Sequence, residues 1–360
     1  MKTAASGRKN KKSIIRLITA IVCVAAAGCL FGILCHLLGK LPEQTMAERW
    51  SKEGGVSQIS CFFSVNAGVT EERLEEFEHT LDDYLTENSI EIQSPNPGAR
   101  LWVDAYSGEG KITLTGGKAS VEADATGIGG DFFLFHPQEL LYGSYFSGND
   151  LNQDYCVIDE DAAWQLFGSN NVAGMSVTIG GIPYIVQGVI RRPDSRLVKA
   201  AGLDSTRVYV SYRTLERYGT ASGINHYEIV MPNPVKQFAY KYVKEQLGAD
   251  ERETEVVENS TRFGLLGCLK RIGAFGTRSM NGRAIIYPYW ENFARGMEDI
   301  QGMFAVSIVL LLIYPVVYGL WAFLYFWKHK GWTFKDLWIK IKDRFERFQE
   351  RRYYQKRGNK

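Results

Sequence analysis

Residues 17–38 read LITAIVCVAAAGCLFGILCHLL and residues 303–327 read MFAVSIVLLLIYPVVYGLWAFLYFW, and neither stretch contains Asp, Glu, Lys or Arg. As helices that rise about 1.5 Å per residue they are about 33 and 38 Å long, whereas the hydrocarbon core of a bilayer is about 30 Å thick. Both stretches are therefore predicted to cross a membrane. Two spans cannot enclose a conduit by themselves, so the chain is neither a soluble enzyme nor a complete polytopic transporter.

The net charge of +2 conceals an uneven distribution of charge along the chain. Residues 1–16 carry six Lys or Arg and no acid, and residues 328–360 carry twelve against four acids. Residues 17–327 carry 24 Lys or Arg against 36 acids. Because basic residues beside membrane spans stay on the cytoplasmic side, both termini are predicted to be cytoplasmic and residues 40–302 extracytoplasmic.

A cleaved signal peptide is the alternative interpretation of the first apolar stretch. The sequence AAGC at residues 26–29 resembles a lipoprotein cleavage site. The apolar run continues beyond it as LFGILC at residues 30–35, where a mature lipoprotein would turn polar. We therefore favour an uncleaved anchor.

The acidic middle part contains two strand–helix–strand patterns. In the first, a strand at 56–65 precedes a helix that Thr70 caps and that ends near Asn88. In the second, a strand at 224–231 precedes a helix capped by Asn233 with Pro234 at its first position; Gly248 ends this helix, and a strand follows at 254–257. The apolar helix faces are Leu74, Phe77, Leu81 and Tyr84, and Val235, Phe238, Tyr242 and Leu247.

These two halves lie about 130 residues apart, which predicts an α+β fold with a split ferredoxin-like β-α-β lobe and a second lobe inserted into it. Three short strands are expected first, at 100–106, 111–114 and 120–127. The insert, at about 131–223, is predicted to be β-rich. Its expected elements are a strand at 156–158, a helix at 160–167 capped by Asp159, and a hairpin of 175–179 with 182–190 in which Ile182, Tyr184 and Val186 share one face.

Several motifs in the insert resemble one known family. They are GDFFLFHP at 130–137, LLYGSYF at 140–146, VIDEDAA at 157–163, LFG at 166–168, VAGM at 172–175 and YIVQGV at 184–189. In this order they are similar to the MacB-like periplasmic core domain, which occurs in ABC-transporter permeases of the MacB/FtsX superfamily. A looser similarity extends from Val56 to about Val257.

The resemblance implies a bacterial plasma-membrane protein that is a non-catalytic subunit of an ABC-type transport or mechanotransmission system. Its expected partners are a cytoplasmic ABC ATPase and a multi-span permease subunit, in a homo- or hetero-oligomer. The extracytoplasmic domain would relay the ATPase cycle to an extracytoplasmic substrate or protein. Family permeases have four membrane helices, so this chain is a reduced form with two. The alternative function is a stand-alone cell-surface module that captures or senses an envelope component or peptide.

Motifs for catalysis or cofactor binding do not emerge from the sequence. The segment Gly116-Gly117-Lys118-Ala119 lacks the first glycine and the hydroxyl of a phosphate-binding loop. The five histidines show no ligand spacing, and acid pairs such as Glu71-Glu72 are interpreted as solvated helix starts. We expect no enzyme activity, catalytic residue, cofactor or metal, and no nucleic-acid partner.

The resulting domain prediction places a basic tail at 1–16, spans at 17–38 and 303–327, the core domain at 39–260, a membrane-proximal stalk at 261–302 and a basic tail at 328–360. The stalk could equally be a surface for a partner. Pro315 lies within the second span and is a candidate hinge, although a proline packed by a neighbouring helix is an equal alternative.

The last tail is predicted to form a basic amphipathic helix. Its apolar face has helical spacing and consists of Phe334, Trp338, Ile341, Phe345 and Phe348. Lys and Arg residues occupy the other faces, so we expect the helix to lie on the anionic inner leaflet. Docking of a partner helix or of the cytoplasmic ATPase is the alternative.

Overall fold

The computed structural model describes residues 2–91, 98–117, 119–193, 195–248, 250–274, 285–330, 338 and 342–347. The chain divides into two compact units. Residues 34–303 form one unit, here called the head, and residues 1–33 with 304–360 form the other.

Two helices are long and apolar enough to cross a membrane. Helix α1 spans Lys2–Leu38 and helix α10 spans Tyr289–His329. Large apolar side chains such as Ile21, Phe31 and Leu310 are exposed on them, as is expected of surfaces that face lipid. The predicted spans 17–38 and 303–327 are each part of a longer continuous helix.

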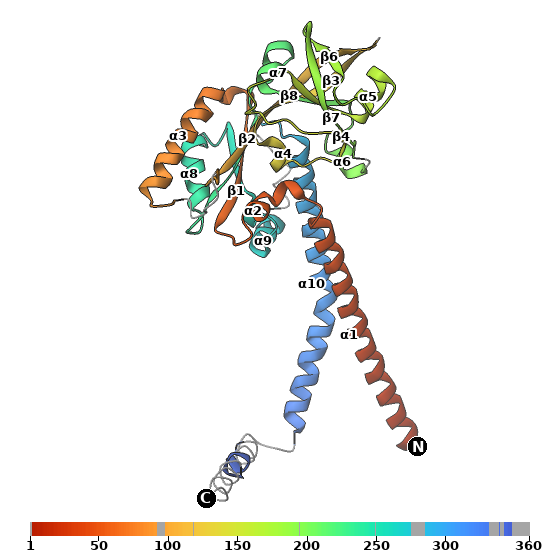
Figure 1. The fold of residues 1–360 in the computed structure, drawn as a ribbon. Coiled ribbons are helices and arrows are strands. Elements are labelled where there is room, and N and C mark those ends of the chain that lie inside the picture. Colours follow the sequence, from red (N-terminus) through yellow and green to blue (C-terminus); the bar gives the residue numbers. More distant parts are fainter. Residues whose placement is uncertain are drawn as a thin grey trace, which may run out of the picture. The chain divides into compact units, whose positions relative to one another are not determined.

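The head contains a ten-stranded mixed sheet in the order β10-β1-β9-β2-β3-β8-β5-β7-β4, with β6 paired to β2 and β7 (Figure 1). The pairs β3–β8 and β5–β7 are parallel, and the other pairs are antiparallel. The strands are β1 Val56–Phe63, β2 Val103–Gly116, β3 Ala119–Gly130, β4 Leu140–Gly143, β5 Tyr155–Asp159, β6 Ser176–Ile179, β7 Ile182–Ile190, β8 Arg207–Ser211, β9 His226–Pro232 and β10 Thr254–Glu258.

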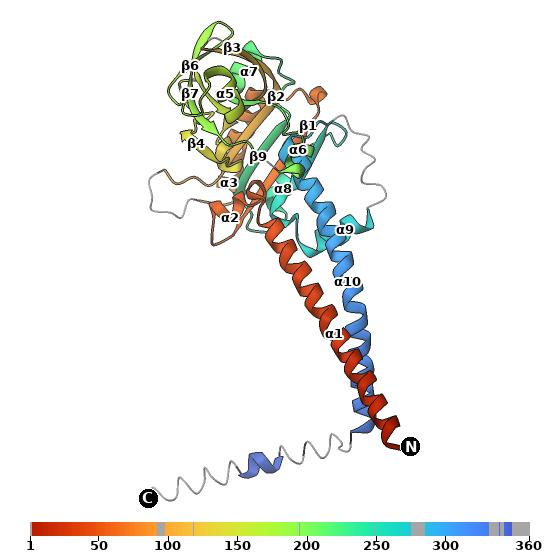
Figure 2. The same cartoon turned by 90° about the vertical axis from the view of Figure 1, so that its right-hand side faces the viewer.

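Short helices connect and cover these strands (Figure 2). They are η1 Pro42–Gln44, α2 Met46–Trp50, η2 Val65–Ala67, α3 Glu71–Glu87, α4 Phe132–Phe135, α5 Glu160–Phe167, α6 Arg196–Ala200, α7 Tyr212–Tyr218, α8 Phe238–Leu247, η3 Asn259–Thr261 and α9 Leu265–Gly273.

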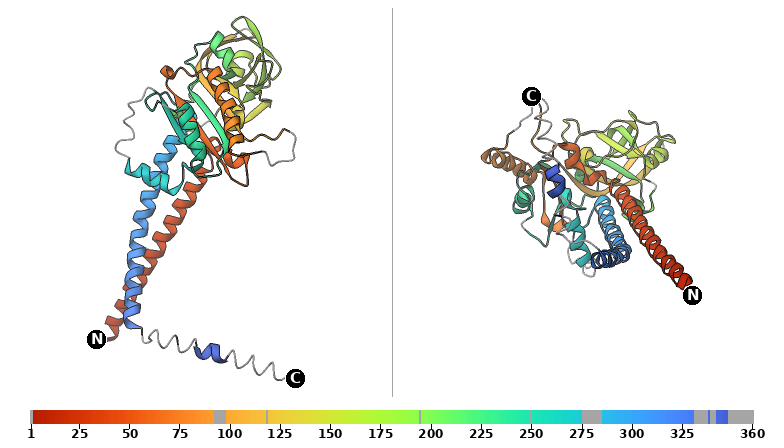
Figure 3. Two further views of the ribbon diagram at one scale, coloured as in Figure 1. Left: turned by 90° about the vertical axis from the view of Figure 1, so that its left-hand side faces the viewer. Right: turned by 90° about the horizontal axis from the view of Figure 1, so that it is seen from below.

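Helices α3 and α8 lie side by side on one face of β1 and β9 (Figure 3). Tyr84 of α3 stacks on Phe238 and Tyr242 of α8, with ring centroids 5.3 and 4.2 Å apart. Successive side chains of a strand point to opposite faces, so Tyr227, Ile229 and Met231 of β9 pack beneath these helices. His226, Glu228 and Val230 therefore point to the other face, where α4 and the start of α10 lie.

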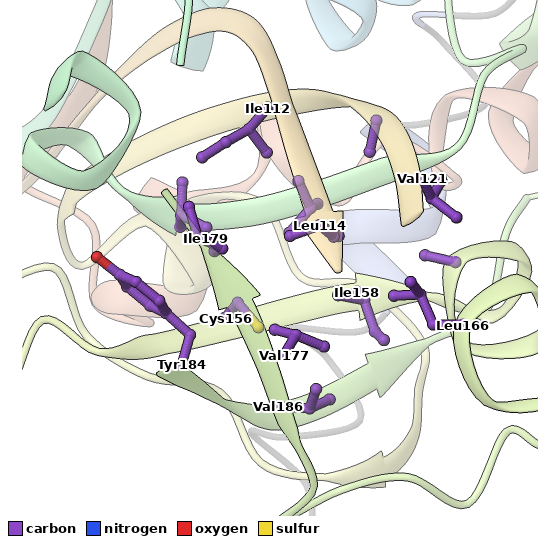
Figure 4. Packing of buried hydrophobic residues seen from close by; sticks show 14 of the residues in the cluster. Ile112, Leu114, Val121, Cys156, Ile158, Leu166, Val177, Ile179, Tyr184 and Val186 are labelled. Carbon is purple, nitrogen blue, oxygen red and sulfur yellow. The ribbon is translucent and has the colours of Figure 1, made fainter. Parts of the chain in front are cut away.

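The far part of the sheet has its own apolar core (Figure 4). Side chains of β2, β3, β5, β6, β7 and β8 meet there with those of α5 and α7. Asp159 caps α5 as predicted, because its Oδ1 accepts a hydrogen bond from the Ala162 N–H at 2.8 Å. Gly180 and Gly181 have φ of 57° and 84°, as a two-residue hairpin turn requires.

Local signals predicted most of these elements, and the structure differs from the predictions first in β2, then in β8 and α7, and then at the start of α8. The expected strands at 100–106 and 111–114 are one strand, β2, which continues through Gly108 and Gly110. The prediction places the end of a strand at these glycines. A Cβ at Gly108 would lie 2.8 Å from the Tyr212 ring, so these glycines allow α7 to pack closely against the sheet. Strand β8 and helix α7 have no counterpart among the predicted elements.

The third difference concerns the start of α8. The helix begins at Phe238 and not at Pro234, because Gln237 adopts a left-handed conformation with φ 67°. Asn233 still binds the helix start, since its Oδ1 accepts a hydrogen bond from the Ala239 N–H at 3.3 Å. Val235 precedes the helix and is 68% exposed, so it does not belong to the apolar face. Ile182, expected to share a face with Tyr184, is likewise exposed.

Candidate functional site

The first turns of α10 are held by a buried arginine, Arg262, which directly follows η3. Its guanidinium donates two hydrogen bonds to the Glu291 carboxylate, at 2.6 and 2.8 Å, and a third to Glu298 at 2.7 Å. It also donates to Gln44 Oε1 at 3.3 Å. A planar guanidinium fits a carboxylate in this two-bond geometry, which fixes the relative orientation of the two groups.

Two further arginines extend this network, which we call the Arg262 network. Arg271 of α9 donates to the Arg262 carbonyl oxygen and to Gln301, both at 2.7 Å. Arg295 donates to Glu291 at 2.7 Å and lies 3.1 Å from Glu255 of β10. The guanidinium carbon of Arg295 is 3.8 Å from the ring centroid of Tyr287, so the cation also contacts an aromatic face.

The spacing of the partners on α10 explains why one arginine can reach them. Glu291 and Glu298 are seven residues apart, which is two helical turns, and they therefore lie on one face. Ala294 and Gln301 continue this buried face. The three arginines, Arg262, Arg271 and Arg295, meet three acids, Glu291, Glu298 and Glu255. The Arg262 network consequently joins η3, α9 and β10 to the head part of α10.

A second buried polar group lies on the face of β9 opposite to α3 and α8. It consists of His136, His226 and Glu228, here called the His-Glu cluster, and all three side chains are fully buried. His136 Nε2 lies 3.0 Å from Glu228 Oε2, and His226 Nε2 lies 3.6 Å from Glu228 Oε1. His226 and Glu228 are two residues apart in β9 and so share a face, while His136 follows α4.

Neighbouring polar groups hold the carboxylate of Glu228 in place. Ser60 of β1 donates a hydrogen bond to Glu228 Oε1. Asn259 Nδ2 donates to Ser60 Oγ at 2.6 Å and lies 3.4 Å from Glu228 Oε1. Trp290 of α10 covers the cluster, with its ring centroid 4.3 Å from that of His136 and 5.2 Å from that of His226.

Burial and charge act on the His-Glu cluster in opposite directions. Burial lowers the pKa of His136, because it disfavours the imidazolium form, and the adjacent Glu228 only partly offsets this. Burial by itself raises the pKa of Glu228, but the two imidazoles more than compensate and the net direction is downward. The carboxylate is therefore expected to be ionised inside the protein.

The head also has a cavity of about 370 Å³ between α3 and β2. Glu78, Asp82 and Asp104 give it an acidic wall, and Trp102 and Tyr106 contribute aromatic surface. Burial, followed by the nearby Glu78 carboxylate, raises the pKa of Asp104 well above its ordinary value. The cavity has the mixed polar and aromatic lining of a ligand-binding hollow.

The residues singled out from the sequence are not part of these clusters. Pro315 lies inside α10, in the unit formed by residues 1–33 and 304–360. Trp338 and Phe345 are helical and exposed, whereas Phe334, Ile341 and Phe348 lie outside the described residues. Whether these five side chains form one face is therefore not tested, and both the hinge and the amphipathic face stay predictions.

Sequence reasoning did not find the buried polar groups because their members are far apart along the chain. Local spacing does not bring the two histidines together, because His136 and His226 are separated by most of the insert. One local signal existed: His226 and Glu228 alternate with apolar residues in a strand whose two faces are both buried. A polar pair in such a strand has to find partners within the protein.

Comparison with known proteins places the head in a family. Residues 54–241 match the family model described as the MacB-like periplasmic core domain. A macrolide export ATP-binding/permease protein MacB of Agrobacterium fabrum is 33% identical over 107 residues, which cover 29% of this chain and 16% of that protein. Its counterpart in Pasteurella multocida is 26% identical over 162 residues, covering 40% of this chain and 25% of the relative. The aligned part thus spans a quarter or less of these relatives.

Two solved structures are also similar. The periplasmic region of MacB from Actinobacillus actinomycetemcomitans matches with a TM-score of 0.38 and 18% identity, over 59% of this chain and 92% of that one. The extracellular domain of the noncanonic ABC-type transporter YknZ from Gram-positive bacteria matches with a TM-score of 0.35 and 17% identity, over 56% and 99%.

Proposed function

The chain belongs to the MacB-like periplasmic core domain family, of the ABC-transporter permeases of MacB/FtsX type, and from this we propose that it is a membrane subunit that relays the cycle of a partner ATPase. The extracytoplasmic head would move with the membrane helices and act on an extracytoplasmic substrate or protein. ATP would be hydrolysed by a separate cytoplasmic ABC ATPase. A multi-span permease subunit would supply the pathway, because two spans cannot.

The observation that carries this proposal is the continuity of α10. The helix runs from Tyr289 to His329, so that one element carries both the Arg262 network and the second apolar stretch. Breaking a buried ion pair leaves an uncompensated charge and typically costs about 3–5 kcal/mol. Displacement of α10 should therefore move η3, α9 and β10 together with it and should not separate them.

A finer description of the fold belongs to the same proposal. The strand order β10-β1-β9-β2, in which α3 follows β1 and α8 follows β9, supports a split ferredoxin-like lobe with an inserted second lobe. In this arrangement the insert, at about 131–223, follows β3 and ends before β9, and a mechanical signal could pass between the lobes along the shared sheet.

The orientation in the membrane is also proposed. The basic residues at 1–16 and 328–360 support cytoplasmic termini, and the acidic part between the spans supports an extracytoplasmic head. The tail that contains Trp338 and Phe345 would lie on the anionic inner leaflet or contact the ATPase. Pro315 would supply the hinge of α10.

The test is capture of the full-length chain from its native membranes, followed by identification of the bound proteins. We expect an ABC ATPase and a multi-span permease to be enriched relative to an unrelated two-span membrane protein. Hydrogen exchange of the captured complex is then compared with and without ATP and vanadate. Trapping the ATPase should change exchange at α9 and at the first turns of α10. A chain with no associates, or a head that does not respond to nucleotide, would contradict the proposal.

A second function has one observation in its favour, the acidic and aromatic cavity between α3 and β2. A stand-alone module that binds an envelope component or a cationic peptide would use such a hollow. Its ligand would protect Trp102 and Tyr106 from exchange and oxidation in the chain without any ATPase. The two functions are thus distinguished by whether the response needs nucleotide.

A further inference from the structure

We propose that the His-Glu cluster is an intrinsic binding site for a divalent transition-metal ion, with zinc as the expected ion. The ligands would be the Nε2 atoms of His136 and His226 and one carboxylate oxygen of Glu228. Imidazole nitrogen and carboxylate oxygen are ordinary zinc ligands, and two histidines with one glutamate leave a fourth position for a water molecule. The proposal does not depend on the transport function.

The spacing of the three groups agrees with coordination of one ion. Their ligand atoms all lie within 4.8 Å of one another. Bonds of about 2.1 Å at tetrahedral angles place two zinc ligands about 3.4 Å apart. The observed nitrogen–oxygen distances, 3.0 Å for His136 and 3.6 Å for His226, lie on either side of this value.

The direction of the side chains is the second argument. Although His136 Nε2 and Glu228 Oε2 are close, neither atom has a hydrogen-bond partner of acceptable geometry, and the same holds for His226 Nε2. Two groups that share a hydrogen bond point at each other, whereas two ligands of one ion point at a position between them. A fully buried polar atom without a partner costs about 1–3 kcal/mol, so three such atoms at one place indicate that a binding partner belongs there.

Charge is the third argument. Among the described residues, the groups within ion-pair distance of Glu228 are the two histidines, and Arg49, which also acts on it, does so only from a longer distance. A buried carboxylate is tolerated when a cation neutralises it, and a divalent ion would do so without protonation of either imidazole.

Outer polar groups orient two of the three proposed ligands, Glu228 and His226, whereas His136 Nδ1 has no hydrogen-bond partner among the described residues. Ser60 binds the Glu228 carboxylate, and Asn259 in turn holds Ser60. Ser107 Oγ lies 3.4 Å from His226 Nδ1, the ring nitrogen that would remain free when Nε2 binds the ion. Such outer partners orient the ligands and raise metal affinity. An ion here would join β9 to the segment after α4, directly beneath Trp290 of α10.

The experiment uses the full-length chain in detergent, without a histidine tag. After removal of metals with EDTA and addition of zinc chloride, zinc that remains after desalting is measured by mass spectrometry. We expect stoichiometric zinc in the wild type and at least a tenfold lower affinity in Glu228→Gln and His226→Gln. The matched control is His79→Gln, since His79 is exposed on α3 and should bind zinc no differently from the wild type.

Because a substitution at a buried site can unfold the head, the wild type alone provides a second readout. Zinc should raise its melting temperature and EDTA should reverse the rise, because a ligand that binds only the folded state stabilises it. Cobalt in place of zinc should give the visible absorption of a tetrahedral site. The proposal is overturned if the wild type retains no zinc and has the same melting temperature with zinc and with EDTA. The cluster is then a buried ion pair that binds no metal. It is equally overturned if folded Glu228→Gln retains zinc as the wild type does.

Discussion

Arg262 shows how a single side chain can determine whether a helix is attached to a domain. Among the described residues, its guanidinium alone donates hydrogen bonds to both Glu291 and Glu298 of α10. Its backbone carbonyl oxygen also accepts a hydrogen bond from Arg271. None of this is visible in the sequence, where Arg262 is one of several cations in a segment without acids. The pairing arises because β10 and η3 bring it to α10 from another part of the chain.

We expect Arg262→Met to destabilise the head by about 3–5 kcal/mol, because two buried carboxylates, Glu291 and Glu298, each lose one of their cationic partners. Arg191→Met is the control, since Arg191 and its partner Glu139 are both largely exposed and the pair contributes at most about 1 kcal/mol. Denaturant unfolding in detergent, followed by tryptophan fluorescence, measures both. Equal losses in the two variants would show that the Arg262 network does not hold α10.

The raised pKa of Asp104 should make the stability of the head depend on pH. Its pKa is raised by burial and then by Glu78, so the folded state keeps a proton that the unfolded state releases. The contribution of this group to stability is therefore complete below about pH 4 and is lost as the pH rises through the raised pKa. As the pH rises above about 4, the wild type should lose more stability than Asp104→Asn. Parallel pH profiles of the melting temperature would contradict this assignment.

At the scale of elements, close packing of α7 depends on small residues in the sheet. A Cβ added at Gly127 of β3 would lie 2.9 Å from Leu215 Cβ and 3.0 Å from Tyr212 Cα. Gly127 of β3 and Gly108 and Gly110 of β2 therefore lie inside continuous strands, at positions where a side chain would collide with α7 or the residues that follow it. Sequence alone interprets a strand glycine as a break, whereas the helix above it requires the absence of a side chain.

Gly127→Ala should cost about 1–3 kcal/mol, because the added methyl group forces α7 away from the sheet. Gly296→Ala in α10 is the matched control, since a Cβ there meets no atom within 4 Å and alanine favours the helix by up to about 1 kcal/mol. Relative to the wild type, the melting temperature should fall in Gly127→Ala and rise in Gly296→Ala. A neutral Gly127→Ala would mean that α7 can move without cost.

The proposed hinge at Pro315 makes a different prediction for α10. Pro315 has no N–H, so the carbonyl of Leu311 lacks its helical partner. In Pro315→Ala this hydrogen bond can form, and amide exchange of the residues around it should slow without any change in the head. Val317→Ala on the same helix is the control. Exchange that is already slow in the wild type and unchanged in Pro315→Ala would show that the helix does not flex there.

At the scale of the whole molecule, charge distribution and membrane insertion determine what the head can reach. The two spans return the chain to the side on which it began, so both basic ends should share one compartment and the acidic head the other. Every proposed partner depends on this partition, because the ATPase is cytoplasmic and the substrate is not.

Protease added to intact cells should remove the head and leave an epitope placed after Lys360 undigested. After permeabilisation the epitope should be lost as well, because cytoplasmic sites then become accessible. Digestion of the epitope in intact cells would reverse the proposed orientation, and with it the assignment of the cytoplasmic partners.

The sequence by itself determined the two apolar helices, the strand before α3, the strands on either side of α8, the cap of α5 and the family of the head. These are properties of neighbouring residues, namely apolar length, helical or strand periodicity and local hydrogen bonding, and they need no knowledge of the fold. Only the tertiary structure decided that β2 is one strand, that Arg262 holds α10, and that His136 meets His226 and Glu228. Those contacts join residues tens to hundreds of positions apart, and a buried charge or imidazole reveals its role only when the groups that surround it are known.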